Sequence, residues 1–194
     1  MPKRSIYLVL DMENDLVHED GPNGKGPYGV QVKARAILDH TARALETARA
    51  AGILVGYVRV GFSPDYRECP PNSPIFSGAR KNGLFKLGQW GTEIHPAIRP
   101  APGDFDVLKH RVSPFYCTSL EAILRAHDVH RIYCSGISTN AVVQGTVRDA
   151  HDRDYEVVIL DDCCCALSAE EHDNAINNLR RFATITSSEQ VVFK

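Results

Sequence analysis

The sequence lacks the features that would assign it at once to several classes of protein. No apolar run reaches the roughly 18 residues needed to cross a bilayer. There is no Cys-x-x-Cys pair and no His-Glu-x-x-His motif, so a local metal site is not expected. The 22 Lys and Arg nearly cancel the 24 Asp and Glu, which argues against nucleic-acid binding by bulk charge. We therefore expect no membrane partner, no nucleic-acid partner and no metal.

The N-terminus and the cysteines both favour a cytoplasmic protein. Residues 1–4 lead directly into an apolar run that ends at Asp11, which is too short for a signal peptide. Three of the six cysteines, at 163–165, are adjacent, and this is poor geometry for a framework of disulfides. We expect reduced thiols. Because 163–165 continues from an apolar strand, packing is favoured over a nucleophilic role there.

Length and composition indicate one domain covering 1–194. Domains average about 150 residues, so 194 residues give little more than one. A chain of this length, 43% hydrophobic, can bury a sizeable core without disulfides.

Short apolar runs alternate with helix-like stretches along the chain. The runs are apolar almost throughout, which is typical of parallel strands buried on both faces. The alternation predicts an α/β fold with helices on both faces of the sheet. The expected strands are 6–10, 53–60, 105–109, 131–137, 156–161 and 183–186, and the expected helices are 30–51, 119–127, 139–153 and 168–181.

The segment 61–103 has a different character. It is rich in Pro, Gly, Ser and Asn and shows no clear periodicity. Loops of this length are often functional. We expect it to form a lid or wall over the ends of the strands.

Parallel sheets bind ligands beyond the carboxyl ends of their strands, and this rule selects a few residues. Asp11 ends the first strand, Lys109 ends the third, and 136–140 joins the fourth to a helix. A carboxylate and an ammonium in a partly dry pocket can serve as general acid or base. Backbone N–H groups of the 136–140 turn can hold an oxyanion. On spacing alone we favour the alternative, in which Asp11 caps a turn and Lys109 is a solvated surface charge.

Five motifs in order resemble the isochorismatase-like hydrolase superfamily, over about residues 5–191. The first follows the opening strand, the second and third surround Lys109, and the last two lie in the C-terminal half. They are 11–15 (Asp-Met-Glu-Asn-Asp), 90–96 (Trp-Gly-Thr-Glu-Ile-His-Pro), Lys109 with Ser113, Phe115 and Tyr116, 136–140 with 146–150, and Asp162 with 166–174.

The resemblance implies a six-stranded, mostly parallel sheet and assembly into dimers or tetramers. Most members are cysteine hydrolases that act on amide-type carbon–nitrogen bonds with a triad of aspartate, lysine and cysteine. Asp11 and Lys109 match the first two. The family's cysteine stands six residues after the loop glycine, here Gly136, and that position is Val142.

This substitution shapes the predicted activity, because valine has no group that can attack a carbonyl. Nicotinamidase relatives also use a metal held by an Asp-x-His pair, which 60–66 lacks. Isochorismatases of the same superfamily also lack the cysteine, carry glycine there, and hydrolyse a vinyl ether by protonation and water addition. That chemistry needs only a pair such as Asp11 and Lys109.

The leading hypothesis is therefore a cofactor-free hydrolase of a small molecule. Asp11 would be the general acid or base, and Lys109 would tune its pKa and bind negative charge. The N–H groups of Ser138 and Val142 would hold an oxyanion. The pocket would be lined by Trp90, Phe115 and Tyr116, for which ordinary core packing is the alternative.

Two other hypotheses stay open at this point. A second thiol, Cys117 or Cys163, would replace the missing nucleophile in an amide hydrolase, or the protein would bind a ligand without turnover. His172 would either meet a neighbouring subunit or be a plain surface histidine, and we favour the second.

Overall fold

The computed structural model describes residues 4–194, and its centre is one six-stranded sheet in which every pairing is parallel. The spatial order is β3-β2-β1-β4-β5-β6, so the order reverses where β1 meets β4. Such a switch point is where open parallel sheets bind ligands. The expected strands are confirmed within a few residues, as Arg4–Leu10 (β1), Leu54–Val60 (β2), Phe105–Lys109 (β3), Val129–Ile137 (β4), Glu156–Cys165 (β5) and Thr184–Thr186 (β6).

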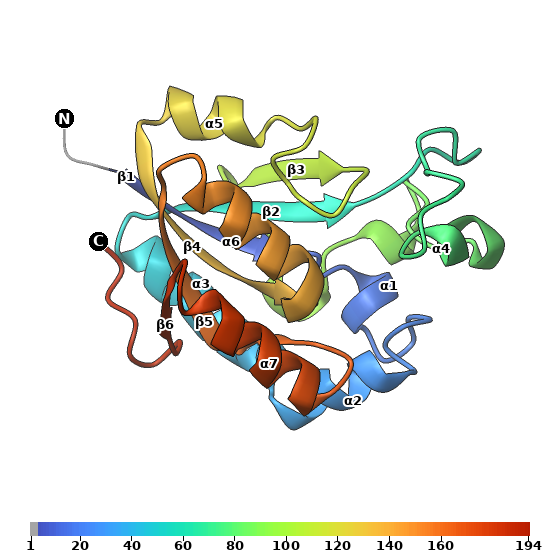
Figure 1. Cartoon of the computed structure of the whole chain (residues 1–194), viewed down its shortest axis with the longest axis horizontal. Coiled ribbons are helices and arrows are strands. Elements are labelled where there is room, and N and C mark those ends of the chain that lie inside the picture. Colours follow the sequence, from blue (N-terminus) through green and yellow to red (C-terminus); the bar gives the residue numbers. More distant parts are fainter. Residues whose placement is uncertain (1–3) are drawn as a thin grey trace.

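The central strand β1 is buried on both faces. Ile6 to Leu10 are all 0% exposed, which explains why this run is apolar without alternation. Tyr7 and Val9 pack on the side covered by α3 (Ile37–Ala50), whereas Leu8 packs on the opposite side. That side is covered by α5 (Leu120–Ala126), α6 (Gln144–His151) and α7 (Ala169–Leu179). Helices on both faces are therefore confirmed (Figure 1).

The expected helix over 30–51 is wrong as a single element. It is two helices, α2 (Pro27–Ala34) and α3, separated at Ala36, whose φ of 47° is left-handed. The Arg35 guanidinium donates to the backbone oxygens of Cys164, at 2.8 Å, and Asp161, at 3.0 Å. This long-range anchorage to β5 holds the break, and helix periodicity alone does not reveal it.

The expected helix over 139–153 begins with a π-helical turn, η3 (Thr139–Val143), and continues as α6. Turns of this kind are frequent at functional sites. The expected cap of the last helix is present, because the Ser168 hydroxyl accepts from the Glu171 N–H at 3.1 Å.

The segment 61–103 contains α4 (Ser77–Asn82) and two short 3₁₀ turns, η1 (Trp90–Thr92) and η2 (Pro96–Ile98). Its order comes from aromatic packing, since Phe62 contacts Tyr66 and Phe76 with ring centroids 6.0 and 5.5 Å apart. In Figure 1, α4 lies with α1 (Asn14–Val17) and α2 on the side toward which β2 and β3 point.

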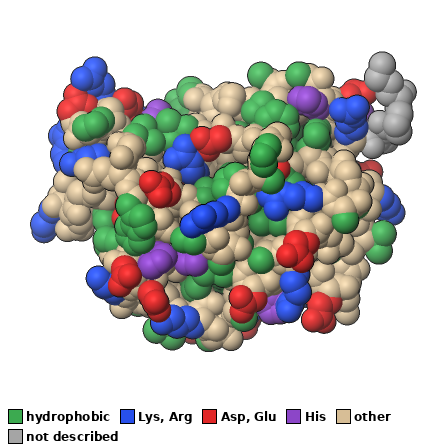
Figure 2. All heavy atoms as spheres, turned by 180° about the vertical axis from the view of Figure 1, so that it is seen from behind, with side chains coloured by type: hydrophobic (Ala, Val, Ile, Leu, Met, Phe, Trp, Pro, Cys, Tyr) green, Lys and Arg blue, Asp and Glu red, His purple; other side chains and the backbone are tan. Residues whose placement is uncertain are grey.

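Charged side chains of both signs are spread over the surface that Figure 2 shows. On the face that Figure 2 shows, acidic and basic side chains are interspersed and neither sign gathers into a patch. Over residues 4–194 no helix has the length and apolarity that crossing a membrane requires.

Candidate active site

A cavity of about 400 Å³ opens at the carboxyl ends of β1, β3 and β4. The predicted residues Asp11, Lys109, Ser138 and Val142 all line it, although they come from three strand ends and from η3. The opposite wall comes from the segment 61–103, as expected. Further lining residues are Leu16, Asn23, Tyr28, Val60, Pro74, Ile75, Phe76, Ser77, Gly78, Ala79, Asn82, Leu84, Phe85, Val112, Ile137 and Ala141.

Asp11 and Lys109 form a buried ion pair at this cavity. Lys109 Nζ lies 2.8 Å from Asp11 Oδ2 and donates to the backbone oxygen of Arg111 at 3.0 Å. Lys109 is only 2% exposed, so the alternative of a solvated surface charge is excluded. Burial raises the pKa of the Asp11 carboxyl, against the opposing effects of the Lys109 charge and hydrogen bond. The pair can therefore hold a proton or release one near the cavity.

Glu13 is a third buried titratable group beside this pair, and sequence reasoning assigned it no role. It is 0% exposed, and neither carboxyl oxygen has a hydrogen-bond partner within residues 4–194. Burial, and then the charge of Asp11, raise its pKa well above the usual range. The signal in the sequence is the acidic run 11–15, in which carboxyl groups at 11, 13 and 15 directly follow a buried strand.

Asp15 joins the acidic segment to the cavity wall. Its Oδ2 accepts from the Phe85 N–H at 2.7 Å, and burial raises its pKa while this hydrogen bond opposes the rise. Asn14 donates to the Trp90 backbone oxygen at 2.9 Å. Helix α1 thus holds both ends of the segment that follows α4.

Val142, at which the resemblance places the family's cysteine, lies on η3 in the cavity lining. It is 2% exposed. Across the cavity stands Tyr28, whose pKa is raised by burial, while a hydrogen bond to Ser138 opposes the rise. Tyr28 and Ser138 therefore bring hydroxyl groups to the cavity that Val142 lines.

None of the cysteines is part of the cavity lining. Cys163 is 0% exposed, and burial raises the pKa of its thiol, so the packing interpretation of 163–165 is confirmed. Cys117 is exposed on the loop before α5. Neither thiol reaches the cavity, and this observation weighs against a replacement nucleophile.

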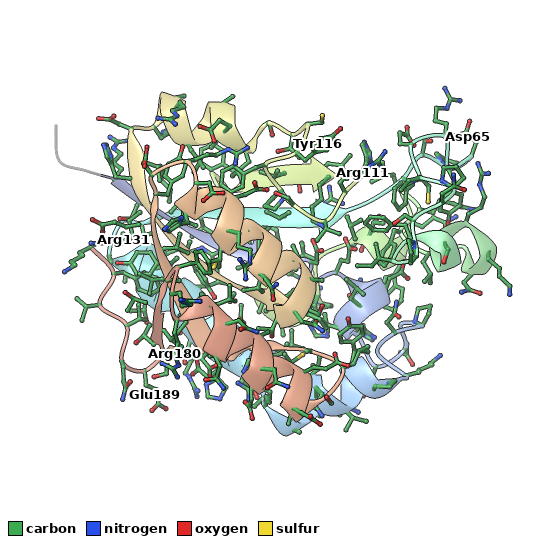
Figure 3. The ribbon with its side chains drawn as sticks, viewed as in Figure 1. Asp65, Arg111, Tyr116, Arg131, Arg180 and Glu189 are labelled. Atoms are coloured by element: carbon green, nitrogen blue, oxygen red, sulfur yellow. The ribbon has the colours of Figure 1, made fainter. Side chains whose placement is uncertain are left out.

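The three aromatic residues expected to line the pocket do not line it. Phe115 is in the core, stacked on Tyr155 with centroids 6.2 Å apart. Tyr116 is 60% exposed on the loop before α5, where Figure 3 labels it. Trp90 is 43% exposed and its ring meets His18 edge-on. The contact of Trp90 with α1 is made by its backbone oxygen, which accepts from Asn14, and not by its ring.

His172 is neither a surface histidine nor free to meet another subunit, so both alternatives for it are wrong. It is 1% exposed. Its Nδ1 lies 2.8 Å from Thr139 Oγ1 and its Nε2 lies 3.0 Å from Asp161 Oδ1. The hydrogen bond from His172 is the main cause of the lowered pKa of Asp161. These two hydrogen bonds of His172 connect η3, and Ser138 directly before it, to α7 and β5.

No group of three or more His, Cys, Asp or Glu is placed to hold a metal ion within the described residues. The Asp11–Lys109 pair gives the cavity side chains that can accept and donate a proton.

The sequence pattern of the isochorismatase domain matches residues 5–190. The chain belongs to the isochorismatase family. It is 34% identical over 170 residues to the ureidoacrylate amidohydrolase RutB of Methylorubrum extorquens. The aligned region covers 81% of this chain and 68% of that protein. Like its relatives, this isochorismatase-family protein is a hydrolase.

Solved structures of the family share the whole fold. An isochorismatase family protein from Desulfovibrio vulgaris is 27% identical, with a TM-score of 0.85 and coverage of 96% of this chain and 95% of that one. N-carbamoylsarcosine amidase from Thermoplasma acidophilum is 26% identical, with a TM-score of 0.74 and coverage of 97% and 98%. The α/β fold with a parallel six-stranded sheet is therefore that of the family.

Proposed function

We propose that this isochorismatase-family hydrolase cleaves a small organic substrate with the Asp11–Lys109 pair and with water as the nucleophile. One observation carries the proposal. Val142 lines the cavity where the family pattern has cysteine, and the Asp11–Lys109 ion pair of 2.8 Å is retained in the same cavity. A side chain without a nucleophilic atom cannot form an acyl-enzyme.

The names of the relatives support an amide-type carbon–nitrogen bond as the bond that is cleaved. In this mechanism the Asp11 carboxylate takes a proton from water as the hydroxyl adds to the carbonyl carbon. The proton then passes to the leaving nitrogen, the C–N bond breaks, and an acid and an amine are released.

Lys109 acts most strongly in the transition state. In the ground state its charge is compensated by Asp11. Once Asp11 holds the proton, that charge is available to the developing oxyanion, together with the N–H groups of Ser138 and Val142. An interaction that strengthens only in the transition state raises the rate.

The C–O bond of a vinyl ether is the second candidate for the bond that is cleaved. Hydrolysis of a vinyl ether proceeds by protonation and water addition, so it requires no nucleophilic thiol. Asp11 in its protonated form would deliver the proton to carbon, and water would add to the resulting cation. The raised pKa of Asp11 favours such an acid.

The test is one assay that follows ammonia and pyruvate together, over a panel of small amides and ureas and with isochorismate. Asp11→Asn should lower turnover by about 100-fold or more, the usual effect of losing a general acid or base. Val142→Ala should retain turnover. Asp20→Asn, which makes the same change on an exposed side chain, is the matched control. Full activity in Asp11→Asn, or loss of activity on treatment with iodoacetamide, would contradict the proposal.

We also propose a homodimer or homotetramer that acts on a small molecule in the cytoplasm, without nucleic-acid or membrane partners. The family resemblance supports the assembly. Light scattering after gel filtration measures it, and a monomer at all concentrations would contradict it.

A further inference from the structure

We propose that the cavity selects uncharged substrates and discriminates against carboxylates. This inference rests on the proposed function, since it takes the same cavity as the substrate site. It replaces the expectation that Lys109 binds the negative charge of a substrate.

The first observation is that the ammonium of Lys109 is already engaged. It contacts Asp11 Oδ2 at 2.8 Å and the Arg111 backbone oxygen at 3.0 Å, and Lys109 is 2% exposed. A carboxylate that enters the cavity meets a compensated ion pair. To bind the ammonium it has to displace the carboxylate of Asp11, a residue that is fixed directly after the buried strand β1.

The second observation is the excess of acid around the pair. Asp11, Glu13 and Asp15 are all buried within five residues of one another. Arg59, the other cation whose charge reaches Glu13, is already paired with Asp106. The buried group formed by Asp11, Glu13 and Lys109 is therefore neutral when Glu13 keeps its proton and negative when it does not. Neither state has a net positive charge to attract a second anion, and the negative state repels it.

The third observation is the character of the remaining lining. Over residues 4–194, Lys109 is the one Lys or Arg side chain in it, and Asp11 is its one carboxyl group. The other polar side chains of the lining are amides and hydroxyls. Arg111, labelled in Figure 3 near the end of β3, donates instead to the backbone oxygens of Glu68 and His110. The neutral polar groups are those of Asn23, Tyr28, Ser77, Asn82 and Ser138.

Amides and hydroxyls donate and accept hydrogen bonds without a charge of their own. They fit neutral amide or urea groups, and the apolar wall from 74–85 fits an alkyl chain. The acrylate part of ureidoacrylate is a carboxylate. The substrate that we infer for this chain therefore differs in charge from the ureidoacrylate named for its relative RutB.

The experiment compares two ligands of the same shape by calorimetry, 3-ureidopropionate and its uncharged counterpart isopentylurea. The wild-type protein should bind isopentylurea about tenfold more tightly or better, as expected when one unit charge is left uncompensated near a surface site. Asp11→Asn frees the Lys109 ammonium and should reverse the preference in favour of 3-ureidopropionate. Asp20→Asn should leave the preference unchanged.

Equal or tighter binding of 3-ureidopropionate by the wild-type protein would overturn the inference. Binding of neither ligand, or an unaltered preference in Asp11→Asn, would also overturn it. Ammonia release is measured on the same samples. Absence of turnover with the binding preference intact counts against the proposed function alone, which keeps the two failures apart.

Discussion

In the proposed mechanism, Val142 is the residue at which this chain departs from the cysteine chemistry that the family resemblance implies. A thiol at this position of η3 would form a covalent intermediate with the substrate, whereas an isopropyl group cannot. The retained pair of Asp11 and Lys109, 2.8 Å apart and nearly inaccessible to solvent, keeps acid–base chemistry at the same position. At the scale of the residue, the proposed mechanism therefore depends on where the proton of Asp11 resides.

The pH dependence of turnover follows from that proton. Burial raises the pKa of Asp11, and the base must be ionised to take a proton from water. We expect kcat/KM for an amide or urea to fall as the pH is lowered, with a midpoint above the pKa of about 3.9 that free aspartate shows. A pH–rate profile measures this. A rate that rises toward low pH would instead support Asp11 as the acid of vinyl-ether hydrolysis.

At the scale of the element, the cavity depends on how α1 holds the segment after α4. Asp15 accepts from the Phe85 N–H, and a Cβ on Gly91 would lie 2.2 Å from Asp15 Oδ1. A glycine at 91 is therefore required for η1 to approach α1 this closely. The 61–103 segment is a wall of the cavity because these contacts fasten it there.

Asp15→Ala should loosen this wall without touching the catalytic pair. It leaves the buried Phe85 N–H without its acceptor, at a cost of about 1–3 kcal/mol in stability. We expect KM to rise and kcat to change little, because the wall would bind the substrate and the transition state equally well. Steady-state kinetics of Asp15→Ala beside Asp39→Ala, an exposed position of α3, test this. An equal fall in kcat with unchanged KM would be evidence that Asp15 acts on the chemistry itself.

At the scale of the whole molecule, buried carboxyl groups set how stability varies with pH. The pKa values of Asp11, Glu13 and Asp15 are all raised in the folded state. Folding then favours the protonated forms, so the contribution of these groups is greatest below their unfolded pKa. It is lost as the pH rises through the unfolded and toward the folded values.

Glu13→Gln tests this linkage in the group with the most complete burial. The amide keeps the shape of the protonated acid and never ionises. We expect a melting temperature a few degrees above wild type at pH 8, and little difference at pH 4, because about 1 kcal/mol moves it by 2–4 °C in a domain of this size. Differential scanning calorimetry across pH, with Glu19→Gln as the exposed control, checks it. A larger gain at pH 4 than at pH 8 would contradict the assigned sign.

The sequence already located the strands by their local pattern, and the family resemblance selected Asp11 and Lys109, which the structure brings together. Continuous apolar runs are needed in strands buried on both faces, and the residues that end parallel strands meet at one edge of the sheet. The aromatic residues 90, 115 and 116 were misplaced for a different reason. Their motifs contribute backbone atoms and core packing to the fold, and the direction of a ring is decided by its neighbours in space.

What the sequence by itself determined is the order of the strands along the chain, the family, and the absence of a thiol at position 142. The tertiary structure decided which distant groups share one buried space. The break at Ala36 depends on Arg35 reaching β5, the isolation of Glu13 depends on what surrounds it, and the place of His172 depends on Thr139 and Asp161. Burial and pairing change the protonation of a side chain, and both are properties of contacts between segments far apart in the sequence.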